Sequence, residues 1–251
     1  KRKVVELSPE DAEAHNNLGF SLRKLGRLEK AEASYRKAIT LGADYAEAHY
    51  NLGITLRKLR RFDEAIASFR TAAALKTDFA EAHSSLGAVL QECGRFGDAE
   101  ACYRTAIAVR ADYFEAHYNL SIMLHGLGRL AEAITSYRQT IALKPDFAEA
   151  YGNLAVIFME LDRLDESEIC LKQSIILKTD NATVYSNLSL TLNALDRLEE
   201  AEASSRRSLI LYPDYAGAHN NLGLTLKELR RLEEAEACYR QAISLKPDFS
   251  E

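Results

Sequence analysis

Residues 46–79 read AEAHYNLGITLRKLRRFDEAIASFRTAAALKTDF, and residues 80–113 read AEAHSSLGAVLQECGRFGDAEACYRTAIAVRADY. Placed one above the other, the two stretches carry identical residues at many positions, as at Leu52 and Leu86. Outward from this pair, the chain divides into windows of 34 residues that begin at Ala12, Ala46, Ala80, Phe114, Ala148, Ala182 and Ala216. A fixed period of this length indicates an array of repeated structural units instead of one central core.

Each window, with its positions numbered as columns 1 to 34, predicts two helices. Apolar residues recur in steps of three and four, which is the spacing of one helical face. Column 7 is always Leu, column 16 is always Arg and column 8 is always small. The Gly-Arg, Arg-Arg or Asp-Arg pair that ends at column 16 predicts the turn between the helices. Column 24 is aromatic in five windows, at Tyr35, Phe69, Tyr103, Tyr137 and Tyr239.

The start of each first helix carries an Asp followed three residues later by Glu, as at Asp44 with Glu47 and Asp78 with Glu81. An Asp side chain can accept a hydrogen bond from a free amide of the first turn while the Glu reaches back. We therefore expect Asp44, Asp78, Asp112 and Asp146 to be the N-caps of their helices.

The predicted organisation is a single array over residues 1–251. Residues 1–11 match the tail of a preceding repeat, and residues 250–251 match the start of a further one. Between them lie the repeats 12–45, 46–79, 80–113, 114–147, 148–181, 182–215 and 216–249. The absence of a polar capping helix at either end predicts a fragment of a longer array. Apolar residues near the ends then predict end-to-end self-association, around Val4, Val5 and Leu7 and around Leu245 and Phe249.

Composition narrows the class of protein. The formal net charge of −5 argues against a general nucleic-acid-binding protein, which needs a basic face. No apolar run approaches the roughly 18 residues that a membrane-spanning helix requires, so no membrane insertion is expected. The N-terminus carries no secretion signal, and a cytoplasmic location is the expectation.

Together, the Leu-Gly, Ala, aromatic, Ala and Pro columns resemble the tetratricopeptide repeat, as in Leu222-Gly223 followed by Ala235, Tyr239, Ala242 and Pro247. The resemblance covers almost the whole chain. It implies an all-α, right-handed superhelical solenoid of seven 34-residue helix-turn-helix repeats, with the first helices lining a concave groove. Such an array is stabilised by individual repeats and by the interfaces between neighbours.

The sequence gives little support for a catalytic site, a metal site or a disulfide. Five windows carry His at column 4 and two carry Tyr151 and Tyr185. Residues one repeat apart lie roughly 8–10 Å apart, too far to share one zinc ion at about 2 Å. Cys102, Cys170 and Cys238 lie two repeats apart and cannot form disulfides. Cys93 is expected to be a buried apolar residue. We predict no catalytic residue, no metal site and no cofactor in this chain.

A ladder of asparagines is the leading candidate for a binding site. Column 6 carries Asn17, Asn51, Ser85, Asn119, Asn153, Asn187 and Asn221, although Asn is a poor helix former. In tetratricopeptide arrays this column faces the concave side, where an amide can bind the backbone of a peptide of any sequence. The alternative is that each Asn caps a neighbouring carbonyl or reflects repeat duplication.

The second candidate feature is a basic end, formed by Arg23 and Lys24 in repeat 1 and Arg57 and Lys58 in repeat 2. These cations would orient a bound chain and attract an acidic segment. Equally, cations are favoured at helix C-termini by the helix dipole alone.

The asparagine ladder also resembles the repeat region of O-linked N-acetylglucosamine transferases and their Spindly-type relatives. That resemblance implies a protein or peptide partner, bound in extended form and recruited as substrate for a catalytic domain elsewhere in the full-length protein. The alternative is a free-standing scaffold that organises a multiprotein complex.

Finally, Leu171 and Ser205 replace the column-24 aromatic in repeats 5 and 6. Loss of a buried aromatic costs about 3–5 kcal/mol in an otherwise unchanged site. The sequence therefore predicts that these two repeats are the least stable part of the array.

Overall fold

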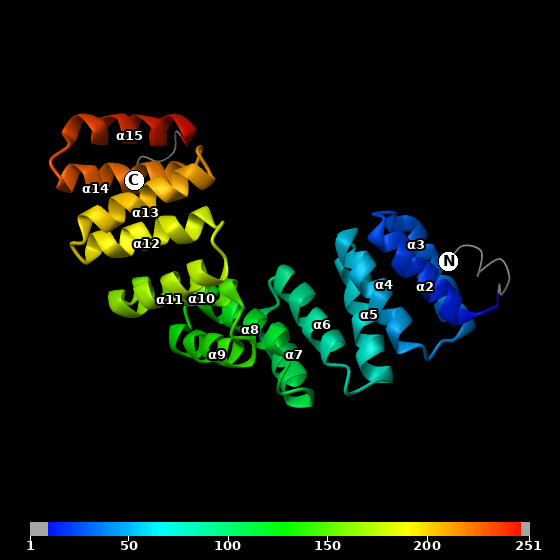
Figure 1. Ribbon diagram of the computed structural model, residues 1–251. Coiled ribbons are helices and arrows are strands. Elements are labelled where there is room, and N and C mark those ends of the chain that lie inside the picture. The colour runs from blue at the N-terminus through cyan, green and yellow to red at the C-terminus, as the bar shows by residue number, and fades with distance from the viewer. Residues whose placement is uncertain (1–9, 247–251) are drawn as a thin grey trace. The chain divides into compact units, whose positions relative to one another are not determined.

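A computed structural model describes residues 10–246, and this range contains helices and no strand. Its contacts divide into two compact units, one ending at Leu127 and one beginning at Gly128. The helices of unit 1 are α2 (Ala12–Lys24), α3 (Leu28–Leu41), α4 (Ala46–Lys58), α5 (Phe62–Leu75), α6 (Ala80–Glu92), α7 (Phe96–Val109) and α8 (Phe114–Gly126) (Figure 1). Those of unit 2 are α9 (Leu130–Leu143), α10 (Ala148–Glu160), α11 (Leu164–Leu177), α12 (Ala182–Ala194), α13 (Leu198–Leu211), α14 (Ala216–Glu228) and α15 (Leu232–Leu245). Every 34-residue window thus contains two helices, and the all-α repeat prediction is confirmed.

Within each unit, the backbones of the first helices of successive repeats approach one another more closely than those of the second helices. In unit 1, α2 contacts α4, α4 contacts α6 and α6 contacts α8. In unit 2, α10 contacts α12 and α12 contacts α14. Within each unit, second helices of successive repeats are joined by side chains instead, as by the ion pair of Arg36 on α3 with Glu64 on α5 (3.0 Å). The first helices therefore form the more closely packed, inner side of each unit.

The predicted N-caps at Asp44, Asp78, Asp112 and Asp146 are wrong by one residue. The N-cap is the following aromatic residue, such as Tyr45 or Phe79, and no side chain caps the helix there. The backbone amide of Tyr45 instead donates to the carbonyl of Gly42, closing a turn in which Asp44 is an inner residue. Asp is common in such turns, and this turn chemistry explains its recurrence.

Two helices do have a side-chain cap, because a polar residue replaces the aromatic at the capping position. The Asp11 carboxylate accepts from the amides of Glu13 (2.9 Å) and Ala14 (3.2 Å). The Asn181 side chain accepts in the same way from Thr183 (3.1 Å) and Val184 (3.3 Å).

The turn inside each repeat places column 15 in the left-handed region. Gly26, Gly94 and Gly128 have φ between 71° and 73°, and four non-glycine residues share this conformation. These are Arg60 (60°), Asp162 (56°), Asp196 (60°) and Arg230 (63°). An L-residue pays roughly 1–2 kcal/mol for it, so the turn is maintained at the expense of local strain.

The core of four repeats depends on a glycine that faces an aromatic ring. A β-carbon built on Gly53 would lie 2.7 Å from the ring of Phe69, and one on Gly19 would lie 2.7 Å from Tyr35. The corresponding distances are 2.9 Å for Gly87 with Tyr103 and 2.8 Å for Gly223 with Tyr239. Column 8 is therefore small because the column-24 ring occupies the space where a side chain would lie.

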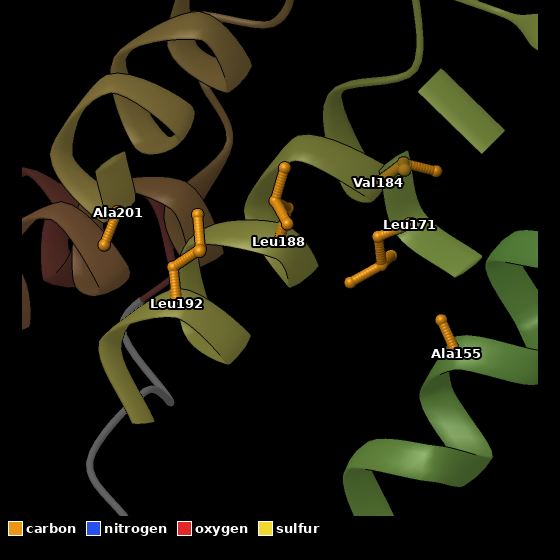
Figure 2. Packing of buried hydrophobic residues seen from close by; sticks show 6 residues of the cluster. All are labelled: Ala155, Leu171, Val184, Leu188, Leu192 and Ala201. Atoms are coloured by element: carbon orange, nitrogen blue, oxygen red, sulfur yellow. The ribbon is translucent and has the colours of Figure 1, made fainter. Parts of the chain in front are cut away.

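Repeats 5 and 6 fill the same space with other residues. Column 8 becomes Ala155 where column 24 is Leu171, and both are fully buried. They belong to a cluster with Val184, Leu188, Leu192 and Ala201, contributed by α10, α11, α12 and α13 (Figure 2). In repeat 6, the hydroxyls of Ser189 and Ser205 lie 2.6 Å apart and are hydrogen-bonded.

The additional serines of these repeats are also hydrogen-bonded. Ser174 donates to the carbonyl of Ala148 (2.9 Å) and Ser208 donates to that of Ala182 (2.8 Å). Buried hydroxyls with partners carry little penalty. In these two repeats the missing aromatic is therefore replaced by a buried leucine and by paired serine hydroxyls, and its loss is not a simple deletion.

At three of the column-16 arginines, the guanidinium joins neighbouring repeats. Arg197 donates to Glu200 three residues on (2.7 Å) and to Glu168 of the preceding repeat (2.6 and 2.7 Å). Arg231 with Glu234 and Glu202, and Arg61 with Glu64 and Glu32, repeat the arrangement. Burial acts to raise the pKa of Glu168, but hydrogen bonds from Lys172 and Arg197 outweigh it and the pKa is lowered. The carboxylate thus remains charged in the folded protein.

The predicted self-association surfaces fall partly outside the described residues. Val4, Val5, Leu7 and Phe249 lie there, as do most of the preceding-repeat tail 1–11 and residues 250–251. Leu245 is the last residue of α15 and is half-buried.

Candidate functional site

The first helices of unit 1 present two hollows separated by one ion pair. The larger, of about 350 Å³, is lined by Arg57, Ala88, Gln91, Glu92, Phe96, Tyr103, Asn119 and Ile122. The smaller, of about 280 Å³, is lined by Ile54, Arg57, Lys58, Phe69, Ser85 and Glu92. Columns 6, 9, 12, 13 and 24 supply most of the lining in both, so the hollow itself is a repeated feature. We call the exposed columns 6, 9, 12 and 13 of the first helices the first-helix surface.

Column 9 is a part of this surface that the sequence analysis missed. It is apolar in every repeat, yet it is half-buried or exposed throughout: Phe20, Ile54, Ala88, Ile122, Val156, Leu190 and Leu224. Phe20 is 40% exposed, Ile122 37% and Leu190 39%. The signal that could have found it was present, since a helix that already buries columns 7 and 11 has no internal need for an apolar column 9. The surface therefore combines amides with apolar side chains.

The asparagines are held by the preceding repeat where that repeat offers a short polar side chain. Asn51 Nδ2 donates to Asn16 Oδ1 (3.0 Å). Asn119 Nδ2 lies 3.5 Å from Ser84 Oγ, and Asn221 Nδ2 donates to the Ser186 hydroxyl (3.0 Å) and carbonyl (3.1 Å). One half of each amide thus joins neighbouring repeats, and the carbonyl half stays available as an acceptor.

Other members of the column differ. Asn17 is exposed, whereas Asn187 is half-buried. The column-5 residue of the repeat before Asn187 is Gly152, which has no side chain to accept a hydrogen bond from the Asn187 amide. Within residues 10–246, neither side chain makes a hydrogen bond. For Ser85, the column-5 residue of the preceding repeat is the bulky Tyr50, and Ser85 itself lines the smaller hollow. Asn153 lies on α10 in unit 2.

The four predicted basic residues differ in whether they pair with a carboxylate. Arg57 lies between the two hollows, but its Nε donates to Glu92 Oε1 (2.7 Å) and its Nη2 donates to the same oxygen. In the described part of the chain, no carboxylate pairs with Arg23, Lys24 or Lys58. The free positive charge of this surface therefore comes from three of the four predicted cations.

Column 12 covers the tip of the column-24 side chain. In repeat 3 the Tyr103 hydroxyl donates to Gln91 Oε1 (2.9 Å), and burial raises the pKa of this tyrosine. In repeat 6 the corresponding Asn193 reaches forward and donates to Thr225 Oγ1 (2.9 Å). A column-12 side chain can thus form a hydrogen bond either within the core of its own repeat or with the neighbouring repeat.

The column-4 histidines bind backbone, as expected for packing residues. His49, His83, His117 and His219 each place Nε2 within 2.8–3.2 Å of the carbonyl oxygen six residues earlier. Each ring thus ties its helix to the turn before it. Burial lowers the pKa of His117, although the contact with the Ala111 carbonyl acts in the opposite direction.

The cysteines give one correction. Cys102, Cys170 and Cys238 are half-buried free thiols whose pKa values are raised by burial. Cys93, expected to be buried, is exposed. It is the C-cap of α6, where the chain leaves the helix, and its side chain does not reach the core.

The described helices include none long and apolar enough to cross a membrane. The same residues contain no cluster of His, Cys, Asp or Glu suited to a metal ion.

Comparison with known proteins gives a consistent result. Tetratricopeptide repeat models match residues 10–78 and 78–146, and related models of that description match 124–189, 181–212 and 216–249. No curated protein sequence matches the chain.

Several solved structures share the fold. One is the hetero-tetramer Cut9-Hcn1 of the APC/C, with a TM-score of 0.72 and 19% identity over 90% of this chain. The chain spans only 44% of the length of that protein. YrrB, described as a tetratricopeptide repeat protein with an unusual peptide-binding site, has a TM-score of 0.57 and 24% identity, covering 78% of this chain and 97% of its own. PilF of Pseudomonas aeruginosa has a TM-score of 0.73 and 17% identity, covering 88% and 96%.

Proposed function

Because this chain belongs to the tetratricopeptide repeat family, we propose that it holds an extended polypeptide segment along its first-helix surface. The observation that carries the proposal is the pair of repeated hollows in unit 1, where amides, apolar side chains and cations line one surface. Surface apolar residues at the same column of every repeat are otherwise a cost to solubility.

The geometry of repeats and of extended chains is compatible. Neighbouring helices pack roughly 8–10 Å apart, and an extended peptide rises about 3.3 Å per residue. Each repeat therefore addresses about three residues of ligand. The free carbonyl of an amide such as Asn119 can accept a peptide N–H, while column 9 contacts alternate side chains.

The experiment is a fluorescence anisotropy titration with an extended, uncharged peptide and Asn→Ala variants. A variant with alanine at Asn17, Asn51, Asn119, Asn153, Asn187 and Asn221 should lose most of its affinity. One hydrogen bond contributes about 0.5–1.5 kcal/mol, so a single change should weaken binding only slightly. Unchanged affinity in a folded sixfold variant would remove the amides from the binding mechanism.

The contacts within the array dictate the choice of controls. Asn51→Ala also removes a hydrogen bond to Asn16, so it should lower both affinity and stability. Asn17→Ala removes no such bond and should lower affinity alone. Circular dichroism melts of the two variants separate the two effects.

A second candidate function is that of a scaffold for a multiprotein complex, and it is favoured by the outer side of unit 2. Ile169 and Ile176 on α11 and Ile210 on α13 are 67%, 72% and 68% exposed. The same columns in unit 1 carry only Ala and Thr. Such residues suit contacts with a folded partner.

A finer version of the first proposal is a substrate-recruiting arm of a glycosyltransferase related to the O-linked N-acetylglucosamine transferases. It rests on the resemblance of the asparagine ladder alone. The sequence of the full-length protein tests it directly, because a nucleotide-sugar-binding α/β domain in the same chain is required.

A further inference from the structure

Arg23 and Arg57 occupy the same column of consecutive repeats but have different partners. Arg57 is held by Glu92, which is the column-13 residue of the next repeat. The residue in that position relative to Arg23 is Lys58. The carboxylate that pairs with Arg57 therefore has no counterpart in the column that corresponds to it for Arg23.

The buried tyrosine next to Arg23 also lacks the partner that its counterpart in repeat 3 has. The Tyr35 side chain is fully buried, and in residues 10–246 its hydroxyl has no hydrogen-bond partner. The equivalent hydroxyl of Tyr103 has Gln91 as its acceptor. Arg23 Nε is likewise buried without a partner. Burial raises the pKa of Tyr35, while the Arg23 side chain acts to lower it, both as a hydrogen-bond donor and through its positive charge. The Arg23 guanidinium thus lies beside the Tyr35 hydroxyl, whose oxygen can itself accept a hydrogen bond, and no carboxylate among residues 10–246 completes the pair.

The surroundings favour an anionic group. Lys24 and Lys58 are exposed and without carboxylate partners among the described residues. The guanidinium carbon of Arg23 lies 5.3 Å from the centre of the Phe20 ring, and Lys24 Nζ lies 5.6 Å from it. The ring supports the guanidinium, whose planar set of donors matches a carboxylate.

We propose that repeat 1 binds a carboxylate side chain of an acidic polypeptide at Arg23, in the place that Glu92 takes at Arg57. This inference rests on the proposed peptide-binding function and gives its ligand a chemical class and an anchored end. The ligand's carboxylate accepts from the Arg23 guanidinium, whose planar donors suit a bidentate contact. Lys24 and Lys58 add a longer-range attraction.

The experiment compares two labelled decapeptides, (Ser-Glu)5 and (Ser-Gln)5, by fluorescence anisotropy at low and high salt. Wild-type protein should bind the acidic peptide at least about tenfold more tightly at low salt, because charge-assisted hydrogen bonds are strong and screened by ions. Arg23→Gln should remove most of this preference. Lys58→Glu should remove it as well, since the new carboxylate can take Arg23 as Glu92 takes Arg57.

The matched control is Lys30→Glu. It makes the same change of charge in repeat 1, but at column 19, where other repeats already carry Glu or Asp beside the column-16 Arg. It should reduce the preference by less than about threefold, because only screened, long-range attraction is lost. Circular dichroism confirms that each variant is folded.

The outcomes separate the two proposals. Equal binding of both peptides by the wild-type protein, or equal losses in Lys58→Glu and Lys30→Glu, contradicts the carboxylate site and leaves the groove function intact. Binding of neither peptide contradicts both. A preference that disappears in Arg23→Gln and Lys58→Glu, and persists in Lys30→Glu, supports the site.

Discussion

Repeats 2 and 5 solve one packing problem with different residues. In repeat 2 the Phe69 ring lies against Gly53, with no room for a β-carbon. In repeat 5 the smaller Leu171 lies across from the larger Ala155, and both are fully buried. The comparison teaches that columns 8 and 24 share one volume. A missing aromatic is therefore compensated on the facing helix, and stability cannot be read from column 24 alone.

The largest effect is expected when the glycine of repeat 2 is exchanged for the alanine of repeat 5. Gly53→Ala places a β-carbon 2.7 Å from Phe69 and should cost about 2 kcal/mol of unfolding free energy. Adding Phe69→Leu should recover part of that loss, because the pair then matches repeat 5. Denaturant melts of the single and double variants measure the coupling.

The control for this cycle is Gly152→Ala. A β-carbon there has its nearest neighbours at 3.6 Å, so the change should be neutral or stabilising. If Gly53→Ala is equally harmless, the ring does not fill the space and the comparison fails.

The same columns show which features of this fold can be predicted from the sequence and which cannot. The repeat period, the two helices of each repeat and the turn before column 16 were all predictable, because each depends only on the spacing of residues along the chain. The position of the caps was missed, since Asp44 is compatible with both a cap and a turn. The compensation between Ala155 and Leu171 was missed because it concerns two helices at once.

For the candidate site, the sequence indicated individual residues but not their partners. Arg57 and Asn119 were both named as candidates, and both line the larger hollow. The neutralisation of Arg57 by Glu92 depends on side chains from two repeats and could not be read from one column. Column 9 was overlooked because apolar residues in a helix suggest a core first.

The next effect concerns the serine pair that replaces the aromatic in repeat 6. Ser205→Ala should cost about 1–2 kcal/mol, because it leaves the fully buried Ser189 hydroxyl without its partner. The double change to alanine should be nearly neutral, since both polar groups are then removed. Thermal melts check this, and a double variant as unstable as the single one would show that the hydroxyls are not partners.

The turns permit a smaller test in both units. Arg60→Gly and Asp196→Gly should each stabilise the protein by about 1 kcal/mol, because glycine adopts positive φ without strain. Gly94→Ala should destabilise it by a similar amount. No change in the unfolding midpoint for any of these would argue against strain at column 15.

The smallest effect is a dependence on pH that separates repeat 4 from repeat 5. The pKa of His117 is lowered by burial, so its folded form favours the neutral ring. Its contribution to stability is present above the ordinary histidine pKa and is lost as the pH falls through the lowered folded value. Repeat 5 carries Tyr151 instead of a histidine in this column. The protection factors of the α8 amides in hydrogen exchange, which correct for the pH dependence of the intrinsic exchange rate, should therefore fall between pH 7.5 and pH 5, and a His117→Tyr variant should lose this response.

The central claim, that the first-helix surface holds the ligand, is tested most directly by methyl NMR of isoleucine. Ile54 and Ile122 line the two hollows, whereas Ile169, Ile176 and Ile210 are exposed on second helices. Adding the (Ser-Glu)5 peptide should shift the signals of Ile54 and Ile122 and leave the other three unchanged. Shifts confined to Ile169, Ile176 and Ile210 would contradict the account and place binding on the outer helices.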